Sequence, residues 1–205
     1  MNIAIIKYGM GNATSVQKTL KKLGYLSVIT EDHKEIEQSD FIILPGVGSF
    51  AAGMENLHKS GLANLLTREV VFKKKPFMGI CLGMQLLATY GNEPYKCLGL
   101  GWIDGEVIKI ESSQNLRIPH LGWDNVEVTE NNSNFYKEFD NLDYYFIHSY
   151  HFLVKNQKDV VLKVTYDISM VAAIQKDNIY AMQFHPEKSQ DAGMKLLKKI
   201  IDQYA

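Results

Sequence analysis

One cysteine of the chain stands between two glycines, in Gly79-Ile80-Cys81-Leu82-Gly83, at the end of an apolar run. This spacing is typical of a nucleophile elbow, a sharp strand-to-helix turn, with cysteine in the place of serine. The turn needs small neighbours because its backbone is strained, and the helix beyond it offers N–H donors and a positive dipole end to the thiol. A buried structural cysteine packed beside glycines is the other interpretation of Cys81. Cys97 has no such surroundings, and we expect it to be structural. The pattern therefore favours thiol chemistry at Cys81.

His185 is the histidine best placed to serve such a thiol as a base, because it closes an apolar segment before Pro186. Proline keeps the preceding residue extended, so we expect His185 and Glu187 to project to the same side. A carboxylate beside an imidazole fixes its tautomer and stabilises the imidazolium. A surface His–Glu pair at a strand end is the alternative. Together with the elbow, the order Cys81, His185, Glu187 predicts a catalytic triad.

A glycine-rich segment, Pro45-Gly46-Val47-Gly48-Ser49-Phe50, follows the buried run Phe41-Ile42-Ile43-Leu44. In a parallel sheet this segment lies at the carboxyl edge, where ligands bind. The two glycines around Val47 let a peptide plane reorient. Because the segment contains no Gly-Lys-Ser/Thr, a nucleotide phosphate loop is not supported. Supplying an N–H donor to an oxyanion is the more economical use of this segment.

Strand and helix patterns alternate through the first half of the chain. Apolar runs at 2–7, 25–30, 41–44 and 77–80 are separated by helical patterns at 12–23, 50–59 and 62–74. This alternation predicts right-handed crossovers and a parallel sheet with helices on both faces. We expect Lys73, Lys74 and Lys75 to lie in solvent at the end of the third helix.

Beyond about residue 100 the pattern changes to short alternating segments, which predict an antiparallel extension. These segments lie near 105–110, 123–128, 143–147, 160–165, 171–175 and 179–184, and a last helix is expected over about 189–203. The sequence contains no evident linker or internal repeat. The predicted fold class is therefore α/β, a parallel or mixed central sheet flanked by helices with an antiparallel extension, in a single domain over residues 1–205.

The composition is that of a folded protein and narrows the class of function. The 205 residues are 46% hydrophobic and 22% charged, with Lys+Arg 22 against Asp+Glu 23. This balance, with Arg68 and Arg117 the only arginines, disfavours nucleic-acid binding. No apolar run approaches the roughly 20 residues of a membrane helix, and the apolar start is too short for a signal peptide. Two cysteines make no disulfide framework, so we expect a cytoplasmic protein.

The three motifs together resemble the class I glutamine amidotransferases, over about residues 2–202. The resemblance implies a flavodoxin-like fold and a glutaminase that forms a γ-glutamyl thioester on Cys81, releases ammonia and hydrolyses the thioester to glutamate. It implies that His185 is the general base and acid and that Glu187 orients it. It implies no metal ion and no other cofactor.

The same resemblance implies roles for backbone groups and for substrate contacts. It implies that the oxyanion hole is formed by the N–H of Leu82 and, after a peptide flip beside Gly48, by the N–H of Val47. Gln85 and the main chain of His148-Ser149-Tyr150 hold the glutamine substrate.

Four further segments resemble one subgroup of the family, the glutaminase subunits of imidazole glycerol phosphate synthases in histidine biosynthesis. They are Tyr8–Asn12, Pro119–Trp123, Phe146–Tyr150 and His185–Ser189. This resemblance implies a partner, a separate (β/α)8 barrel cyclase that receives the ammonia and makes imidazole glycerol phosphate and AICAR. The positions that match the subunit interface are Asn12, Trp123, Tyr145 and Lys188. Core packing is the alternative for Trp123, and a solvated surface position is the alternative for Lys188.

Three other interpretations remain. Lys7, Asp124 and Ala181-Met182 depart from the residues usual in the subgroup. These departures are compatible with a paralogous glutaminase, one that supplies ammonia for amidino groups in bacterial surface polysaccharides or flagellin glycans. A free-standing γ-glutamyl hydrolase would share Cys81 and His185 but act without a partner. A non-catalytic binding module would tolerate loss of the thiol, and the intact triad disfavours it.

Overall fold

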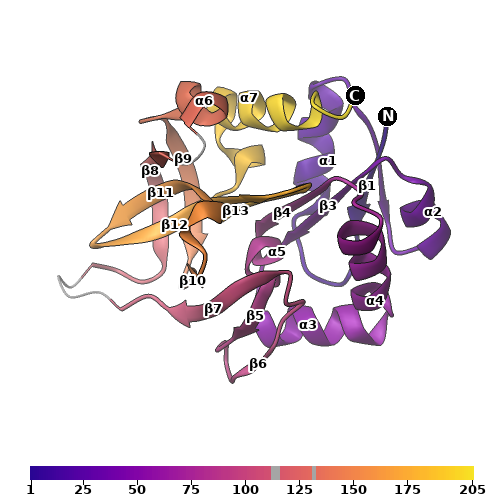
Figure 1. Ribbon diagram of the computed structural model, residues 1–205, viewed down its shortest axis with the longest axis horizontal. Helices are drawn as coiled ribbons and strands as arrows, with labels where there is room; N and C mark the ends of the chain where they lie inside the picture. Colours follow the sequence, from indigo (N-terminus) through magenta and orange to yellow (C-terminus); the bar gives the residue numbers. More distant parts are fainter. Residues whose placement is uncertain (112–115, 131–132) are drawn as a thin grey trace.

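The structure, a computed structural model, describes residues 1–111, 116–130 and 133–205. A nine-stranded sheet runs through it in the order β2-β1-β3-β4-β13-β12-β11-β8-β9 (Figure 1). Five neighbouring strands are parallel, namely β1 (Asn2–Ile6), β2 (Leu26–Thr30), β3 (Phe41–Gly46), β4 (Phe77–Cys81) and β13 (Ile179–Met182). The other four are antiparallel, namely β8 (His120–Val128), β9 (Asp143–His148), β11 (Val160–Tyr166) and β12 (Ile168–Lys176). This mixed sheet confirms the predicted α/β class with its antiparallel extension.

A second sheet of four strands has the order β10-β7-β5-β6. Its strands are β5 (Ala88–Gly91), β6 (Cys97–Leu98), β7 (Ile103–Lys109) and β10 (Tyr150–Val154). Only β7 matches a strand expected from the sequence. The others were not predicted because β5 and β6 are short and β10 begins two residues after β9, with no turn signal between them.

Helices cover both faces of the parallel half of the main sheet (Figure 1). α1 (Ala13–Lys22) and α7 (Gln190–Ile201) lie on one face, and α3 (Phe50–Lys59) and the shorter α4 (Leu62–Leu66) lie on the other. Short pieces are α2 (His33–Gln38), α5 (Leu82–Gln85), α6 (Ser133–Tyr136), the π-helical η1 (Thr67–Phe72), and the 3₁₀ turns η3 (Lys137–Phe139), η4 (Gln157–Asp159) and η5 (Pro186–Lys188). The helix predicted over 62–74 is present over 62–72, but it changes from α-helical to π-helical at Thr67. Among the described residues, no helix is long and apolar enough to cross a membrane.

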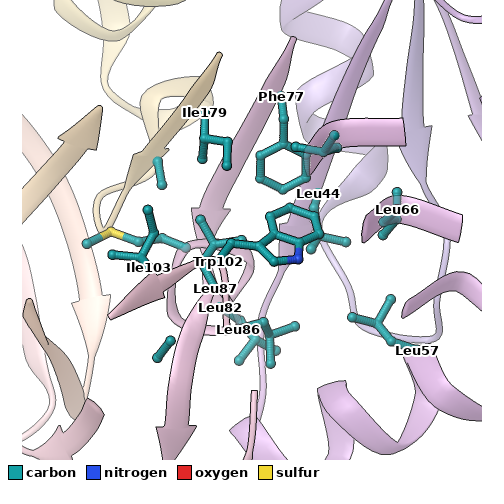
Figure 2. Close-up of a cluster of buried hydrophobic side chains, with 14 of the residues drawn as sticks. Leu44, Leu57, Leu66, Phe77, Leu82, Leu86, Leu87, Trp102, Ile103 and Ile179 are labelled. Carbon is teal, nitrogen blue, oxygen red and sulfur yellow. The ribbon is translucent and has the colours of Figure 1, made fainter. Parts of the chain in front are cut away.

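Two apolar cores, one on each face of the sheet, hold the parallel strands in place. Figure 2 shows the core under α3 and α4, where the rings of Phe77 and Trp102 meet edge to face with centroids 5.1 Å apart. Burial on both faces explains why these strands are continuous apolar runs in the sequence. Because β3 and β4 are packed from both sides, Gly46 and Cys81 at their carboxyl ends are held side by side.

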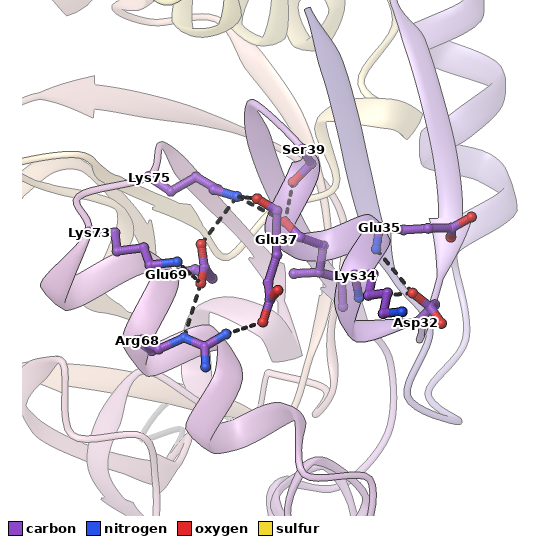
Figure 3. A network of polar contacts seen from close by, with 10 residues as sticks. Asp32, Lys34, Glu35, Glu37, Ser39, Arg68, Glu69, Lys73 and Lys75 are labelled. Atoms are coloured by element: carbon purple, nitrogen blue, oxygen red, sulfur yellow. Dashed lines mark hydrogen bonds and ion pairs between the residues drawn. The ribbon is translucent and has the colours of Figure 1, made fainter.

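A buried carboxylate, that of Glu69 on η1, is surrounded by three cations (Figure 3). Its Oε1 lies 3.2 Å from Arg68 Nε and 2.8 Å from Lys73 Nζ, and its Oε2 lies 3.3 Å from Lys75 Nζ. The Lys75 ammonium also donates to two backbone carbonyls at the end of α2. The predicted solvent position is therefore wrong for Lys75, whose side chain is 12% exposed. Burial raises the pKa of Glu69, but the hydrogen bonds from the three cations outweigh it and lower the pKa.

We expect Glu69→Gln to lower the free energy of unfolding by about 2 kcal/mol at neutral pH, because Lys75 loses the charge that offsets its burial. The pKa of Glu69 is lower in the folded than in the unfolded chain, so this difference is present above about pH 4.3 and is lost as the pH falls through the folded pKa. Urea unfolding at a series of pH values measures it. Lys59→Ala, which removes an exposed partner of Glu55, is the control and should cost less than about 0.5 kcal/mol. A difference between wild type and Glu69→Gln that does not change with pH would contradict this account.

Candidate active site

Cys81 is the last residue of β4, and its backbone makes a sharp turn into α5. Its φ is 54° and its ψ is −109°, outside the regions that non-glycine residues ordinarily adopt. A Cβ on Gly83 would overlap the carbonyl of Leu44, and a Cβ on Gly79 would lie 2.7 Å from the carbonyl oxygen of Gly83. Strand and turn approach one another so closely that both positions require glycine. This is the geometry of a nucleophile elbow.

The helix that follows the elbow is a single turn. α5 has four residues, Leu82–Gln85, and the chain enters β5 at Ala88. One turn of helix carries little macrodipole, so the contribution of α5 to the site is reduced to the N–H groups of its first turn.

His185 lies between the Cys81 thiol and the carboxylate of Glu187. Its Nδ1 is 2.8 Å from Oε1 of Glu187, which also accepts a hydrogen bond from Nδ2 of Asn12 at 2.7 Å. Because a carboxylate only accepts, Nδ1 of His185 carries the proton and Nε2 is left for the thiol. Asn12, which we expect at a subunit interface, is half-buried, and its side chain donates a hydrogen bond to Glu187 of the triad. The His185–Glu187 contact arises from the turn η5 rather than from the extended chain that the sequence suggests.

The charges of this group of side chains favour a protonated His185. Its Nε2 is buried and, among the described residues, has no hydrogen bond other than the approach of Cys81. Burial lowers the pKa of His185, but the interactions with Cys81 and Glu187 outweigh it and raise the pKa to about 9. A raised pKa means that the imidazolium is stabilised by negative charge around it. A thiolate and an imidazolium side by side are the reactive form of a cysteine nucleophile.

His148 faces the same site, and its nitrogens are both engaged elsewhere. Nδ1 lies 2.9 Å from the carbonyl oxygen of Tyr150, and Nε2 lies 2.9 Å from Nδ1 of His120, whose Nε2 is 2.6 Å from a carboxylate oxygen of Asp124. Burial lowers the pKa of His148 to about 3. A ring held neutral in this way is a poor base, so the geometry favours His185 for that role.

The thiol opens into a cavity of about 340 Å³, a volume at the low end of small-molecule sites. Its walls come from the ends of β4 and β9, from α5, from the start of β10, and from connecting segments that include the loop after β3. The residues that line it are Val47, Gly48, Ser49, Cys81, Leu82, Gln85, Glu93, Pro119, Ile147, His148, Ser149 and Tyr150. All the residues expected from the sequence to form an oxyanion hole or to hold a substrate therefore line one cavity.

The backbone after β3 can approach the thiol because its residues are small and closely packed. Gly48 has a φ of 124°, which favours glycine, and a Cβ there would lie 2.6 Å from Cε of Met10. A Cβ on Gly11 would lie 3.2 Å from Cγ2 of Val47. The N–H of Val47 donates to no described residue. This N–H is therefore left without a protein partner among the described residues.

Comparison with known proteins identifies the family. Residues 4–203 match the family model for glutamine amidotransferase class-I. The chain belongs to the class I glutamine amidotransferases.

The chain is similar to named proteins in sequence and to solved structures in fold. It is 45% identical over 200 residues to "Imidazole glycerol phosphate synthase subunit HisH 1" of Campylobacter jejuni, covering 97% of this chain and 98% of that protein. It is 42% identical over 201 residues to the HisH 2 subunit of Methanococcus maripaludis, covering 98% and 99%. A solved structure described as a glutamine amidotransferase superposes with a TM-score of 0.75 at 17% identity, over 97% of this chain and 98% of that chain, and has the same fold.

Two residues at the site of this amidotransferase are not indicated by any spacing in the sequence. Glu93 comes from the loop between β5 and β6, and its Oε2 accepts a hydrogen bond from the N–H of Phe50 at 3.3 Å. Burial raises the pKa of its carboxyl group. Gln183 lies behind the nucleophile, with Nε2 3.7 Å from Sγ of Cys81, and also accepts a hydrogen bond from Gln85 at 2.9 Å. Only the fold brings these residues to Cys81.

An apolar patch is exposed beside the cavity, on one face of β8 and β9. It consists of Leu121, Trp123, Tyr145 and Ile147, which share a face because Leu121 is paired with Ile147 and Trp123 with Tyr145. Trp123 is 45% exposed, so core packing is wrong for this residue. Its ring lies 5.9 Å from that of Tyr145, and Nζ of the exposed Lys188 lies 5.7 Å from the Tyr145 ring. Two of the four predicted interface residues, Trp123 and Tyr145, therefore belong to this patch, and a third, Lys188, lies beside it.

Proposed function

We propose that this chain is the glutaminase subunit of an imidazole glycerol phosphate synthase, acting as a single domain in the cytoplasm. It hydrolyses glutamine to glutamate and ammonia, and the ammonia passes to a separate (β/α)8 barrel cyclase that makes imidazole glycerol phosphate and AICAR. The observation that carries the proposal is the strained Cys81, beside the His185–Glu187 pair, at a cavity that fits an amino acid. The HisH relatives support the choice of pathway. The two free cysteines suit a reducing compartment.

The triad performs the hydrolysis in two steps. The Cys81 thiolate attacks the side-chain amide carbon of glutamine, and the carbonyl electron pair moves to oxygen. His185 gives its proton to the departing nitrogen, so ammonia leaves and a γ-glutamyl thioester remains. The neutral His185 then takes a proton from a water molecule, which attacks the thioester and releases glutamate. Glu187 holds the imidazole in place through both steps.

Two backbone N–H groups stabilise the oxyanion in this mechanism, those of Leu82 and Val47. Gly46 and Gly48 flank Val47 and permit the 46–47 peptide to rotate toward the thiol. In the isolated subunit this peptide presents its carbonyl to the oxyanion, so hydrolysis is slow. Binding of the partner favours the rotated peptide and stimulates the glutaminase.

The cavity accounts for recognition of glutamine. The backbone of His148, Ser149 and Tyr150 forms one wall, and Gln85 fixes that wall by donating from Nε2 to the Tyr150 carbonyl oxygen at 2.9 Å. Glu93 is the one carboxylate among the described lining residues. An ionised Glu93 pairs with the α-ammonium group of the substrate.

The apolar patch is the surface that the barrel partner covers. Aromatic side chains are typical of interface centres, and here the exposed Trp123 stands beside the half-buried Tyr145. The patch borders the cavity through Ile147. A partner seated there receives ammonia directly from Cys81. Lys188 lies between this surface and the triad, because its Nζ is 5.7 Å from the Tyr145 ring and it follows Glu187 in the chain.

We expect Trp123→Ala to weaken binding of the cyclase about 30-fold or more, as is typical of a central aromatic residue. The thermal midpoint of the free subunit should change little, because Trp123 is half-exposed. Isothermal titration with the cyclase subunit measures the dissociation constant. Leu98→Ala, at an exposed position on β6, is the control and should leave binding unchanged. Equal affinities of the Trp123→Ala and wild-type subunits would place the interface elsewhere.

Glutamate release by this chain, alone and with a histidine-pathway cyclase and its nucleotide ligand, tests the proposed pathway. We expect stimulation well above tenfold. Glutaminase activity that only a partner from a surface-sugar pathway stimulates would identify the paralogous function instead. Equal activity in all conditions would identify a free-standing γ-glutamyl hydrolase.

A further inference from the structure

The hydroxyl of Tyr8 is a buried polar group that the mechanism above does not use. Tyr8 follows β1 and is 4% exposed, and its oxygen has no hydrogen-bond partner among the described residues. A buried hydroxyl without a partner is costly, because its hydrogen bonds to water are lost and not replaced. Such a group requires an explanation, and for Tyr8 its surroundings supply one.

This hydroxyl lies against the segment that carries the oxyanion donor. A Cβ on Gly46 would overlap the Tyr8 oxygen and would lie 3.2 Å from Cζ of the ring. The ring is also close enough to Cys81 to sense its charge: burial raises the pKa of Tyr8 far above its ordinary value, and a thiolate at Cys81 raises it further. The phenol therefore keeps its proton and remains a hydrogen-bond donor.

The pairing of β3 with β4 determines where the carbonyl of Gly46 points before the peptide rotates. Ile42 is paired with Phe77, and its N–H donates to the carbonyl of Pro76 at 2.9 Å. In a parallel ladder the same pattern repeats at every second residue. Gly46 and Cys81 are the last pair of this ladder, and the ladder pattern directs the Gly46 carbonyl to the β4 side.

Rotation of the 46–47 peptide moves this carbonyl to the other side of β3. When the N–H of Val47 turns toward the thiol, the carbonyl oxygen of Gly46 must turn away from β4, because the two groups point in opposite directions in one peptide plane. The strand on that other side is β1, and Tyr8 follows its carboxyl end. The Tyr8 hydroxyl, which already lies against Gly46, is the nearest described donor without a partner on that side.

We propose that Tyr8 is a positioning residue for the oxyanion hole: its hydroxyl donates to the Gly46 carbonyl only when the 46–47 peptide is rotated. The unpaired hydroxyl raises the free energy of the resting form, and the new hydrogen bond lowers that of the active form. Both effects favour the state in which Val47 N–H meets the oxyanion. The inference rests on the proposed glutaminase mechanism, and Tyr8 itself touches no reacting atom.

Tyr8→Phe in the complex with the cyclase and its nucleotide ligand tests this role. We expect kcat for glutamine to fall about tenfold while KM stays within twofold, because one hydrogen bond of the active state is lost. The thermal midpoint of the variant should stay the same or rise, since the resting form loses an unpaired hydroxyl. Tyr144→Phe is the matched control, because Tyr144 also has a buried hydroxyl without a described partner and packs on Phe184 in the core. It should leave kcat unchanged.

Alkylation of Cys81 by iodoacetamide, which forms no oxyanion, separates a role in the oxyanion hole from a role in thiol reactivity. Its rate should be the same in Tyr8→Phe and wild type. An unchanged kcat in Tyr8→Phe, with an active wild type, would overturn the role of Tyr8 and leave the glutaminase proposal intact. A parallel loss of alkylation would also overturn it. A wild-type complex without Cys81-dependent glutaminase activity would overturn both proposals.

Discussion

Replacing Cys81 with alanine should lower glutamate release by at least about 10³-fold, because no other group at the site can form the thioester. The measurement is the rate of glutamate formation by the variant in complex with the cyclase. Cys97→Ala is the matched control and should keep full activity, since Cys97 lies on β6, away from the cavity. Turnover by Cys81→Ala within tenfold of the wild-type rate would exclude the thiol as the nucleophile.

The same variant has a second expected effect, on the ionisation of His185. The interaction with Cys81 is the larger of the two that raise the pKa of His185 to about 9. Removing the thiol should therefore lower this pKa, and NMR titration of the imidazole measures it. The stability that the protonated His185 contributes is complete below about pH 6.5 and is lost as the pH rises through about 9. In Cys81→Ala this loss should begin at lower pH.

Val47→Pro should abolish stimulation by the partner and lower the stimulated rate about 10²- to 10³-fold, the usual cost of one lost oxyanion donor. Proline removes the N–H that donates to no described residue in the present structure. Val47 is 40% exposed, so loss of its side chain does not disturb the core. Kinetics of glutamate release with and without the cyclase measure the effect.

Val47→Ala is the control for the proline variant, because it shortens the side chain and keeps the N–H. It should retain stimulation close to that of the wild type. Stimulation of Val47→Pro equal to that of Val47→Ala would mean that the Val47 N–H is no part of the oxyanion hole.

The features predicted correctly from the sequence are those made by residues that are neighbours in the chain. The glycines around Cys81 signal the turn because strand and turn must approach closely, and the apolar runs signal β3 and β4 because both of their faces are buried. His185 and Glu187 are two residues apart, and in an extended chain that spacing puts two side chains on the same side. The structure reaches their contact through the turn η5 rather than an extended chain.

Features that depend on contacts between distant segments could not be predicted in this way. Glu93 and Tyr8 reach the site from different loops, and neither has a spacing that links it to Cys81. The buried position of Lys75 depends on Glu69 on η1, a π-helical segment that helical periodicity does not reveal. Asn12 matches an interface position by resemblance, yet its side chain contacts Glu187.

The central claim is that Cys81 carries a γ-glutamyl group during turnover. Mass spectrometry of the protein, quenched in acid while it hydrolyses glutamine with the cyclase bound, tests this most directly. We predict a mass increase of one γ-glutamyl group on the peptide that contains Cys81, absent when glutamine is omitted and absent in Cys81→Ala. An active complex in which that peptide stays unmodified, or in which another residue carries the group, would contradict the account.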